Sequence, residues 1–293
     1  MTAERKKGLL FASAGSIFWG SSGIAGQFLL INENIAPEWL TFFRLLCAGF
    51  LLLLLSHFLK GNISAIWKDR RDRRTLLIFS AFGMLGTQYG YFASIRCSNA
   101  PTATILEYLM PILIIFWYCL SEKRWPRTVE IFCALFAITG TALIATGGDF
   151  RSLSISGKAL FWGLLSALAC ALYTVEPVGI IKKYGAPLVV GWGMFLASFV
   201  LLPVVSLTPF TGTVDMPVLL SFAYVVLFGT ICSFVLYLGS VAYILPTEAS
   251  IISAIEPLSS IIFSFLIFHL TFSFWELMGM ALIILAVAVV ARK

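Results

Sequence analysis

Two stretches of the sequence read alike: residues 101–111 are PTATILEYLMP, and residues 246–257 are PTEASIISAIEP. Each begins with Pro-Thr and ends at a proline that closely follows a glutamate, and one residue of gap aligns them. The correspondence extends outward to Glu130 with Glu276 downstream and to Gly86-Thr87 with Gly229-Thr230 and Ala36-Pro37 with Ala186-Pro187 upstream. The chain is therefore an internal duplication, with one repeat expected in residues 1–146 and the other in residues 147–293.

The composition indicates that both repeats lie in a membrane. Of 293 residues, 60% are hydrophobic and 12% charged, and the mean hydropathy is +0.97. A soluble globular chain carries about 25% charged residues, so a membrane is the solvent that fits this chain. The net charge of +6 is more economically explained by basic residues at a membrane face than by a nucleic-acid partner.

Apolar runs of about 20 residues, the length that crosses a bilayer, predict ten spans. They are residues 8–30, 37–59, 75–94, 100–120, 127–146, 157–180, 187–207, 217–239, 246–268 and 273–291. Because each repeat holds an odd number of spans, the second repeat must be inverted relative to the first. We expect an all-α integral membrane protein of ten transmembrane helices arranged as two inverted five-helix repeats. Inverted repeats are typical of secondary transporters.

Basic residues predict the orientation. With the N-terminus inside, the cytoplasmic segments hold residues 5–7, the run from Lys60 to Arg74, the cluster 123–127, Lys182 and Lys183, and residues 292–293. The opposite side holds only Arg96, Arg151 and Lys158. We therefore expect a multi-pass protein of the inner (plasma) membrane with both termini in the cytoplasm.

Three glutamates fall inside predicted spans, each close to a proline: Glu107, Glu176 and Glu256. Proline lacks the N–H that would bond the carbonyl four residues back, so we expect free carbonyls at Glu107, Tyr173 and Ser253. Carboxylates inside a membrane are costly and usually functional. Their pattern favours a zwitterionic or cationic substrate or a proton, with an internal ion pair as the alternative. Glu248, after Pro246, is expected in the first turn of a helix.

Four further residues are candidates for the same site. Arg44 can bind a substrate carboxylate, pair with a glutamate or reach the membrane interface. Trp19 and Gln88 lie in the middle of their spans, and Tyr173 lies deep in the sixth; each is predicted to line a pocket because an unpartnered polar group there is costly. Six scattered cysteines show no metal-ligand spacing, so we predict no metal, no cofactor and no catalytic residue.

Short motifs carry a resemblance to a known family. Phe18-Trp19-Gly20-Ser21, Pro37 with Phe43-Arg44, Ser121-Glu122-Lys123-Arg124 and Ile255-Glu256-Pro257-Leu258 resemble the EamA-type branch of the drug/metabolite transporter superfamily. The likeness covers essentially the whole chain. It implies transport by alternating access, with a cargo among amino acids, amines, nucleosides, sugars and drugs.

We therefore expect a secondary transporter, in export mode, of small polar metabolites such as amino acids or amines. Uptake and cationic drug efflux are the alternatives, and a membrane enzyme or a scaffold is a remote one. Expected partners are the small-molecule substrate and the lipid bilayer, with protons a candidate coupling ion, no nucleic acid, and a monomeric or homodimeric state. No Walker A motif occurs in the sequence, so ATP is not expected to drive transport directly.

Overall fold

The computed structural model describes residues 3–59, 62–121, 123–149, 154–240, 243–244, 252–253 and 255–290, and their secondary structure is helical throughout. The first half contains α1 (Ala3–Gln27), η1 (Phe28–Asn32), α2 (Pro37–Phe58), η2 (Ala65–Trp67), α3 (Arg70–Ile78), η3 (Phe79–Met84), α4 (Leu85–Cys97), α5 (Ala100–Glu107), α6 (Met110–Ser121) and α7 (Thr128–Thr146). The second half contains α8 (Gly157–Val175), α9 (Val178–Tyr184), α10 (Ala186–Leu207), α11 (Met216–Val226), η4 (Leu227–Cys232), α12 (Ser233–Ser240), α14 (Ile255–Phe268) and α15 (Phe274–Val290).

Within the described residues these helices group into ten spans at the predicted positions. Seven helices are long and apolar enough to cross a membrane, and α14 and α15 contribute shorter apolar helices. The remaining span is the continuous helix α3–η3–α4, whose hydropathy is lowered by polar residues such as Gln88. The predicted position of Glu248 lies outside the described residues.

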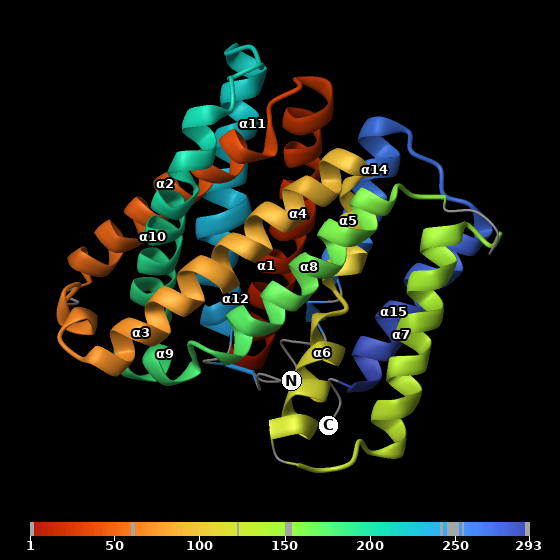
Figure 1. Cartoon of the computed structure of the whole chain (residues 1–293), viewed down its shortest axis with the longest axis horizontal. Helices are drawn as coiled ribbons and strands as arrows, with labels where there is room; N and C mark the ends of the chain where they lie inside the picture. Colours follow the sequence, from red (N-terminus) through yellow and green to blue (C-terminus); the bar gives the residue numbers. More distant parts are fainter. Residues whose placement is uncertain are drawn as a thin grey trace.

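The packing of the spans shows the inverted duplication (Figure 1). Helix α2 packs on α10, its counterpart in the second repeat, and α7 packs on its counterpart α15. Helix α1 packs on α12 and α14, and its counterpart α8 packs in the same way on α4 and α5. These interfaces therefore have equivalents on exchange of the halves, as a pseudo-two-fold axis requires. Spans one, three, four, six, eight and nine surround the centre, between the α2–α10 pair and the α7–α15 pair.

Prolines interrupt two spans where the sequence predicts. The fourth span breaks at Tyr108–Leu109, between α5 and α6, before Pro111, and no described residue donates a backbone hydrogen bond to the carbonyl of Glu107. The sixth breaks at Glu176–Pro177, between α8 and α9. A helix that loses its i→i−4 bond at proline exposes polar backbone, so these breaks place carbonyl groups within the protein.

Both third spans contain a π-helix, η3 in the first half and η4 in the second. In η4, the Thr230 hydroxyl donates to the carbonyl of Val225 at 2.9 Å, and the Ser233 hydroxyl donates to that of Phe228 at 2.6 Å. These hydroxyls supply extra donors where the regular ladder changes register. Single π-turns inside α-helices are frequent at functional sites, and η4 holds part of the site described below.

Candidate functional site

Arg44 extends from α2 toward the centre of the molecule and is only 5% exposed. Its Nε donates to Thr230 Oγ1 at 2.9 Å, and its Nη2 donates to the carbonyl of Gly229 at 3.3 Å. The guanidinium carbon lies 5.1 Å from the centre of the Phe92 ring, a cation–π distance. The π-helix η4 therefore orients the guanidinium from one side and an aromatic face from another. Its hydrogen-bond partners among the described residues are neutral.

Glu107 lies at the C-terminal end of α5, where the proline break begins. Its carboxylate accepts a hydrogen bond from the Ser166 hydroxyl of α8, which also lies 3.2 Å from the carbonyl of Thr87. This contact joins the fourth span to the sixth. The carboxylate and the free carbonyl of Glu107 are thus both held at the break, as the sequence predicts.

Glu256 lies in the first turn of α14, beside α1. The predicted free carbonyl of Ser253 is wrong, because the backbone N–H of Glu256 donates to it at 2.9 Å. Pro257 sits in the first turn of the helix, where a missing N–H leaves no partner unsatisfied. Pro257 therefore begins this helix and, unlike Pro111, does not break one. Gly20 of α1 packs directly on the carbonyl of Glu256, and a Cβ there would lie 2.5 Å from it.

The three ionisable residues form one electrostatic group. Arg44 interacts at a distance with both Glu107 and Glu256, and the two carboxylates interact with each other. Among the described residues Arg44 forms no ion pair within 4.0 Å. The guanidinium and the two carboxylates thus lie within electrostatic reach of one another without a direct ion pair. Both glutamates are partly exposed.

Aromatic side chains of α1, α8 and α12 form a cluster. Trp19 packs against Phe234 at 5.3 Å and against Tyr237 at 5.1 Å between ring centres. Tyr173 contacts the same Phe234 at 6.4 Å and stacks on Phe79 at 5.8 Å. Phe234 therefore brings Trp19 and Tyr173 together, although the sequence places them in different repeats.

The structure does not bring all predicted site residues together. Gln88 is 8% exposed in α4, and none of the described hydrogen bonds of Arg44 or Glu107 involves it. Glu176 is half-buried in the turn before Pro177 and is not among the charged neighbours of Arg44, Glu107 or Glu256. It therefore lies outside the central group.

Ser166, Thr230 and Phe92 contribute to the group but are not predicted by the sequence. Small polar residues are common between membrane helices, so Ser166 and Thr230 carry no distinctive signal. Which ionisable group Ser166 and Thr230 contact depends on the rotation of α8 and on the π-turn in η4, and only the structure shows these.

Comparison with known proteins identifies the family of this chain. The model of the EamA-like transporter family matches the chain twice, over residues 6–146 and 157–292. The chain belongs to the EamA-like transporter family. Like other members it is a multi-pass membrane transporter, and each match covers one of the two five-span repeats.

Two relatives of this EamA-like transporter are named as transporters without a substrate. An uncharacterized inner membrane transporter, YicL, from Salmonella typhimurium is 37% identical over 286 residues, covering 98% of this chain and 95% of that protein. The uncharacterized transporter YdeK from Bacillus subtilis is 26% identical over 270 residues, covering 89% and 87%. A solved crystal structure matches with a TM-score of 0.64 over 97% of this chain and 96% of that one. At 16% identity, that likeness supports the fold alone.

Proposed function

We propose that this EamA-like transporter exports small amino acids or amines by alternating access, using a central site formed by Arg44, Glu107, Glu256, Trp19, Gln88 and Tyr173. The charge balance of that site is the observation that carries the proposal. Two carboxylates face one guanidinium, and none of the three is paired with another within 4.0 Å. A charge inside a membrane span without an ion-pair partner is costly, so the site favours a ligand that supplies a positive charge.

An amino acid carries a positive and a negative charge, and the site has oppositely charged groups for both. Its ammonium group can lie between Glu107 and Glu256, and its carboxylate can accept hydrogen bonds from Arg44. The rings of Trp19 and Tyr173 offer negative faces to the ammonium group, and the amide of Gln88 can serve a further polar group. A simple amine satisfies the carboxylates alone. A proton can replace the ammonium group, which makes protons a candidate coupling ion.

The inverted repeats support alternating access. Exchange of conformation between residues 1–146 and residues 147–293 converts an outward-open state into an inward-open one around a fixed central site. We place the protein in the inner membrane with both termini in the cytoplasm, because basic residues concentrate on that side. Such a cycle is reversible, so uptake of the same compounds is the alternative and the gradients decide. Efflux of cationic drugs would use the carboxylates without Arg44.

The test is thermal stabilisation of the purified protein by three matched compounds: an amino acid, the amine that lacks its carboxylate, and the acid that lacks its amine. A ligand that binds the folded state raises stability by mass action. We expect the wild type to respond to the amino acid most and to the acid least. Glu107→Gln and Glu256→Gln should lose the response to both amine-bearing compounds. Arg44→Gln should lose the preference for the amino acid over the amine.

Glu276→Gln is the matched control, because Glu276 accepts a hydrogen bond from the backbone of Ser273 at the start of α15, away from the central group. Glu176→Gln tests the glutamate that lies outside the group, and its response should resemble that of the control. An unchanged response in both central glutamate variants would refute the proposed site. Transport of the stabilising compound into proteoliposomes then tests the function itself.

A further inference from the structure

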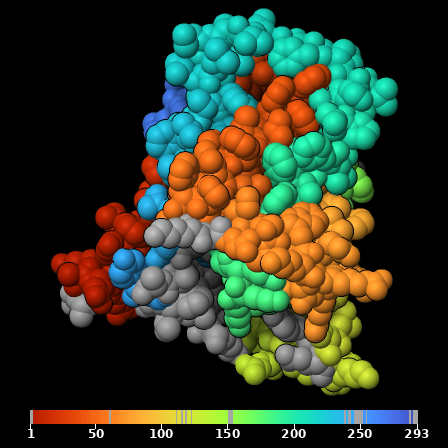
Figure 2. Space-filling view, turned by 90° about the vertical axis from the view of Figure 1, so that its left-hand side faces the viewer, coloured from red at the N-terminus to blue at the C-terminus, as the bar shows by residue number. Residues whose placement is uncertain are grey.

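An exposed basic cluster lies at the end of the molecule that carries the start of α3 and helix α9. It consists of Lys68, Arg70, Arg71, Arg73, Arg74, Lys182 and Lys183, all exposed. Seven basic side chains thus stand against two acidic ones, Asp69 and Asp72. Figure 2 faces this side, where the orange surface of α2 and α3 meets the green surface of α9 and α10.

The acidic residues of this cluster are already engaged. Asp69 caps α3 by accepting from the backbone N–H of Arg71 at 2.8 Å. Asp72 accepts from Lys183 Nζ at 2.6 Å and from the Tyr184 hydroxyl at 2.7 Å. The arginines of α3 form no ion pair with a carboxylate among the described residues. Their charge is therefore available to an external anion.

The position of these arginines is unfavourable for the helix itself. Four of them occupy the first five residues of α3, at the positive end of the helix dipole. Basic residues stabilise the opposite end of a helix. Their concentration at this end, together with the dipole, attracts an anion.

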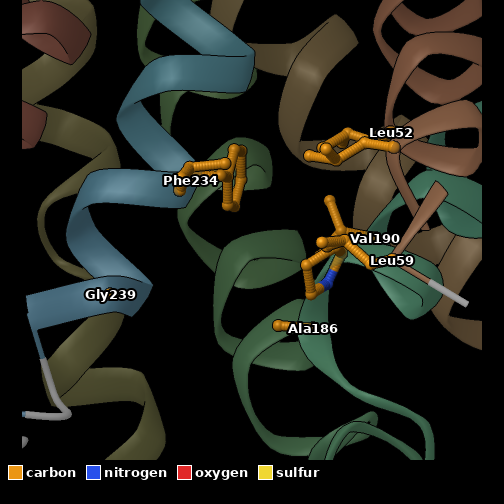
Figure 3. Close-up of a pocket in the computed structure, with 9 residues that line it drawn as sticks. Leu52, Leu59, Ala186, Val190, Phe234 and Gly239 are labelled. Atoms are coloured by element: carbon orange, nitrogen blue, oxygen red, sulfur yellow. The ribbon is translucent and has the colours of Figure 1, made fainter. Parts of the chain in front are cut away.

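An apolar groove opens near the start of α10 (Figure 3). It has a volume of about 330 Å³ and lies between α12 and the α2–α10 pair. Its walls include Leu52 and Leu59 from the second span, Ala186 and Val190 from α10, and Phe234 and Gly239 from α12. Leu59 and Val235 of this lining are exposed, so the groove is open at the apolar surface of the spans.

The groove and the basic cluster are held together by α10. Ala186 follows Lys183 by three residues, at the start of α10. Farther along α10, Trp192 Nε1 donates to the carbonyl of Ile63 at 2.8 Å, and Trp67 packs edge-on against Trp192 at 5.1 Å. The segment that precedes the arginines is thus fixed against the helix that lines the groove.

From this arrangement we infer that the protein binds an anionic phospholipid, with the phosphate at the basic cluster and an acyl chain in the groove. Basic clusters next to a membrane span attract anionic lipids, and the groove supplies the apolar contact that a soluble anion cannot use. Orientation in the membrane accounts for basic residues on one side but not for a groove beside them. Phe234 lines this groove and also contacts Trp19 and Tyr173 of the proposed substrate site, but the basic cluster shares no residue with that site, and binding of the lipid does not depend on the proposed substrate.

The experiment uses the delipidated, full-length protein in detergent. Dioleoyl phosphatidylglycerol should raise the melting temperature by about 3 °C or more at saturation. Dioleoyl phosphatidylcholine and inorganic phosphate at the same concentrations should leave it unchanged. An equal response to both lipids, a response to phosphate, or no response at all would each refute the inference.

Variants separate the two parts of the site. Arg71→Gln with Arg74→Gln should raise the lipid concentration needed for half of the stabilisation by about tenfold. The control, Lys6→Gln with Lys123→Gln, removes the same charge from other exposed positions and should not.

Val235→Trp fills the groove from an exposed position, and Leu285→Trp adds the same ring on an exposed face of α15. Only Val235→Trp should weaken the response. If a variant and its control changed the lipid response equally, the lipid would bind the surface in general, and the inferred site would be wrong.

Because these variants retain most basic residues, correct insertion is expected, and the wild-type lipid comparison decides the question if one variant fails to fold. A second measurement is the phosphatidylglycerol that copurifies from membranes, quantified per protein by mass spectrometry. It should be depleted in Val235→Trp relative to Leu285→Trp. Equal amounts in these two variants would also contradict the inference.

Discussion

At the scale of single residues, Ser166 is the contact that positions Glu107. The hydroxyl is fully buried and lies between the Glu107 carboxylate and the carbonyl of Thr87. A hydrogen bond to a charged group contributes about 1.5–3 kcal/mol. We predict that Ser166→Ala raises the KM for transport by about tenfold, measured in proteoliposomes. Ser198→Ala is the control, because that buried hydroxyl donates to the carbonyl of Phe195 in its own helix and to no other described residue; equal KM values in the two variants would exclude a positioning role.

The Asp72 contacts predict how the stability of the protein depends on pH. Asp72 lies before the predicted span of residues 75–94. A hydrogen bond from Lys183, and a weaker contribution from Tyr184, hold the pKa of its carboxyl below the ordinary value. The same contact raises the pKa of Lys183. Since an unfolded aspartate has a pKa of about 3.9, the stabilisation is fully present above about pH 4. It is lost as pH falls through the lower pKa of the folded state.

Asp72→Asn should therefore lower the melting temperature by about 2 °C at pH 7, and this difference should shrink near about pH 3. Asp69, whose carboxylate lies 3.7 Å from Lys183 Nζ, and Arg71 remain in place in this variant. The control is Asp215→Asn, because Asp215 caps α11 and asparagine caps a helix equally well. A difference that persists unchanged in acid would contradict the linkage to Asp72.

The sequence predicts the ionisable members of the candidate site better than their partners. Arg44, Glu107 and Glu256 are conspicuous because charges inside a membrane are costly. Ser166 and Thr230 resemble many other small polar residues in the spans. Which of them meets a charge depends on the rotation of each helix about its axis, and apolar runs that are hydrophobic all round do not determine that rotation.

At the scale of elements, the close approach of α1 to η4 depends on Gly229. A Cβ at this position would collide with the side chain of Ser22. In the same span, a Cβ at Gly239 would meet only Phe11 Cδ2, at 3.8 Å. Gly229→Ala should destabilise the protein by about 1–3 kcal/mol, whereas Gly239→Ala should be neutral or stabilising by up to about 1 kcal/mol. Thermal unfolding compares the two, and equal changes would show that α1 and η4 can separate without cost.

The interruptions of the spans show which element features a sequence encodes. Pro111 and Pro177 lie at helix breaks as predicted, because a proline in a helix interior removes a hydrogen bond, whereas α10 continues through Pro203. Pro257 has no such effect because the helix begins around it. The π-turns η3 and η4 have no proline and no change in hydropathy, since they arise from a shift of backbone register that packing selects. Their occurrence in the third span of both repeats is visible only in the structure.

At the scale of the whole molecule, the duplication constrains the arrangement more than any single motif does. Once each repeat holds five spans, the second must be inverted, and interfaces must occur in equivalent pairs. The α2–α10 and α7–α15 pairs and the matching contacts of α1 and α8 satisfy this requirement. Span number and length follow from hydropathy, which explains why the architecture is predictable although the identity of contacting side chains is not.

The orientation of the whole molecule remains a prediction from its basic residues, and it can be measured directly. In a variant without the six native cysteines, Thr211→Cys reports the link between α10 and α11, and Lys123→Cys reports the link between α6 and α7; both positions are exposed. An impermeant maleimide applied to intact spheroplasts should label Thr211→Cys and should label Lys123→Cys only after permeabilisation. The reverse pattern would place both termini outside. It would also place the basic cluster of α3 and α9 on the outer side of the membrane, which would contradict the rule that basic loops stay in the cytoplasm.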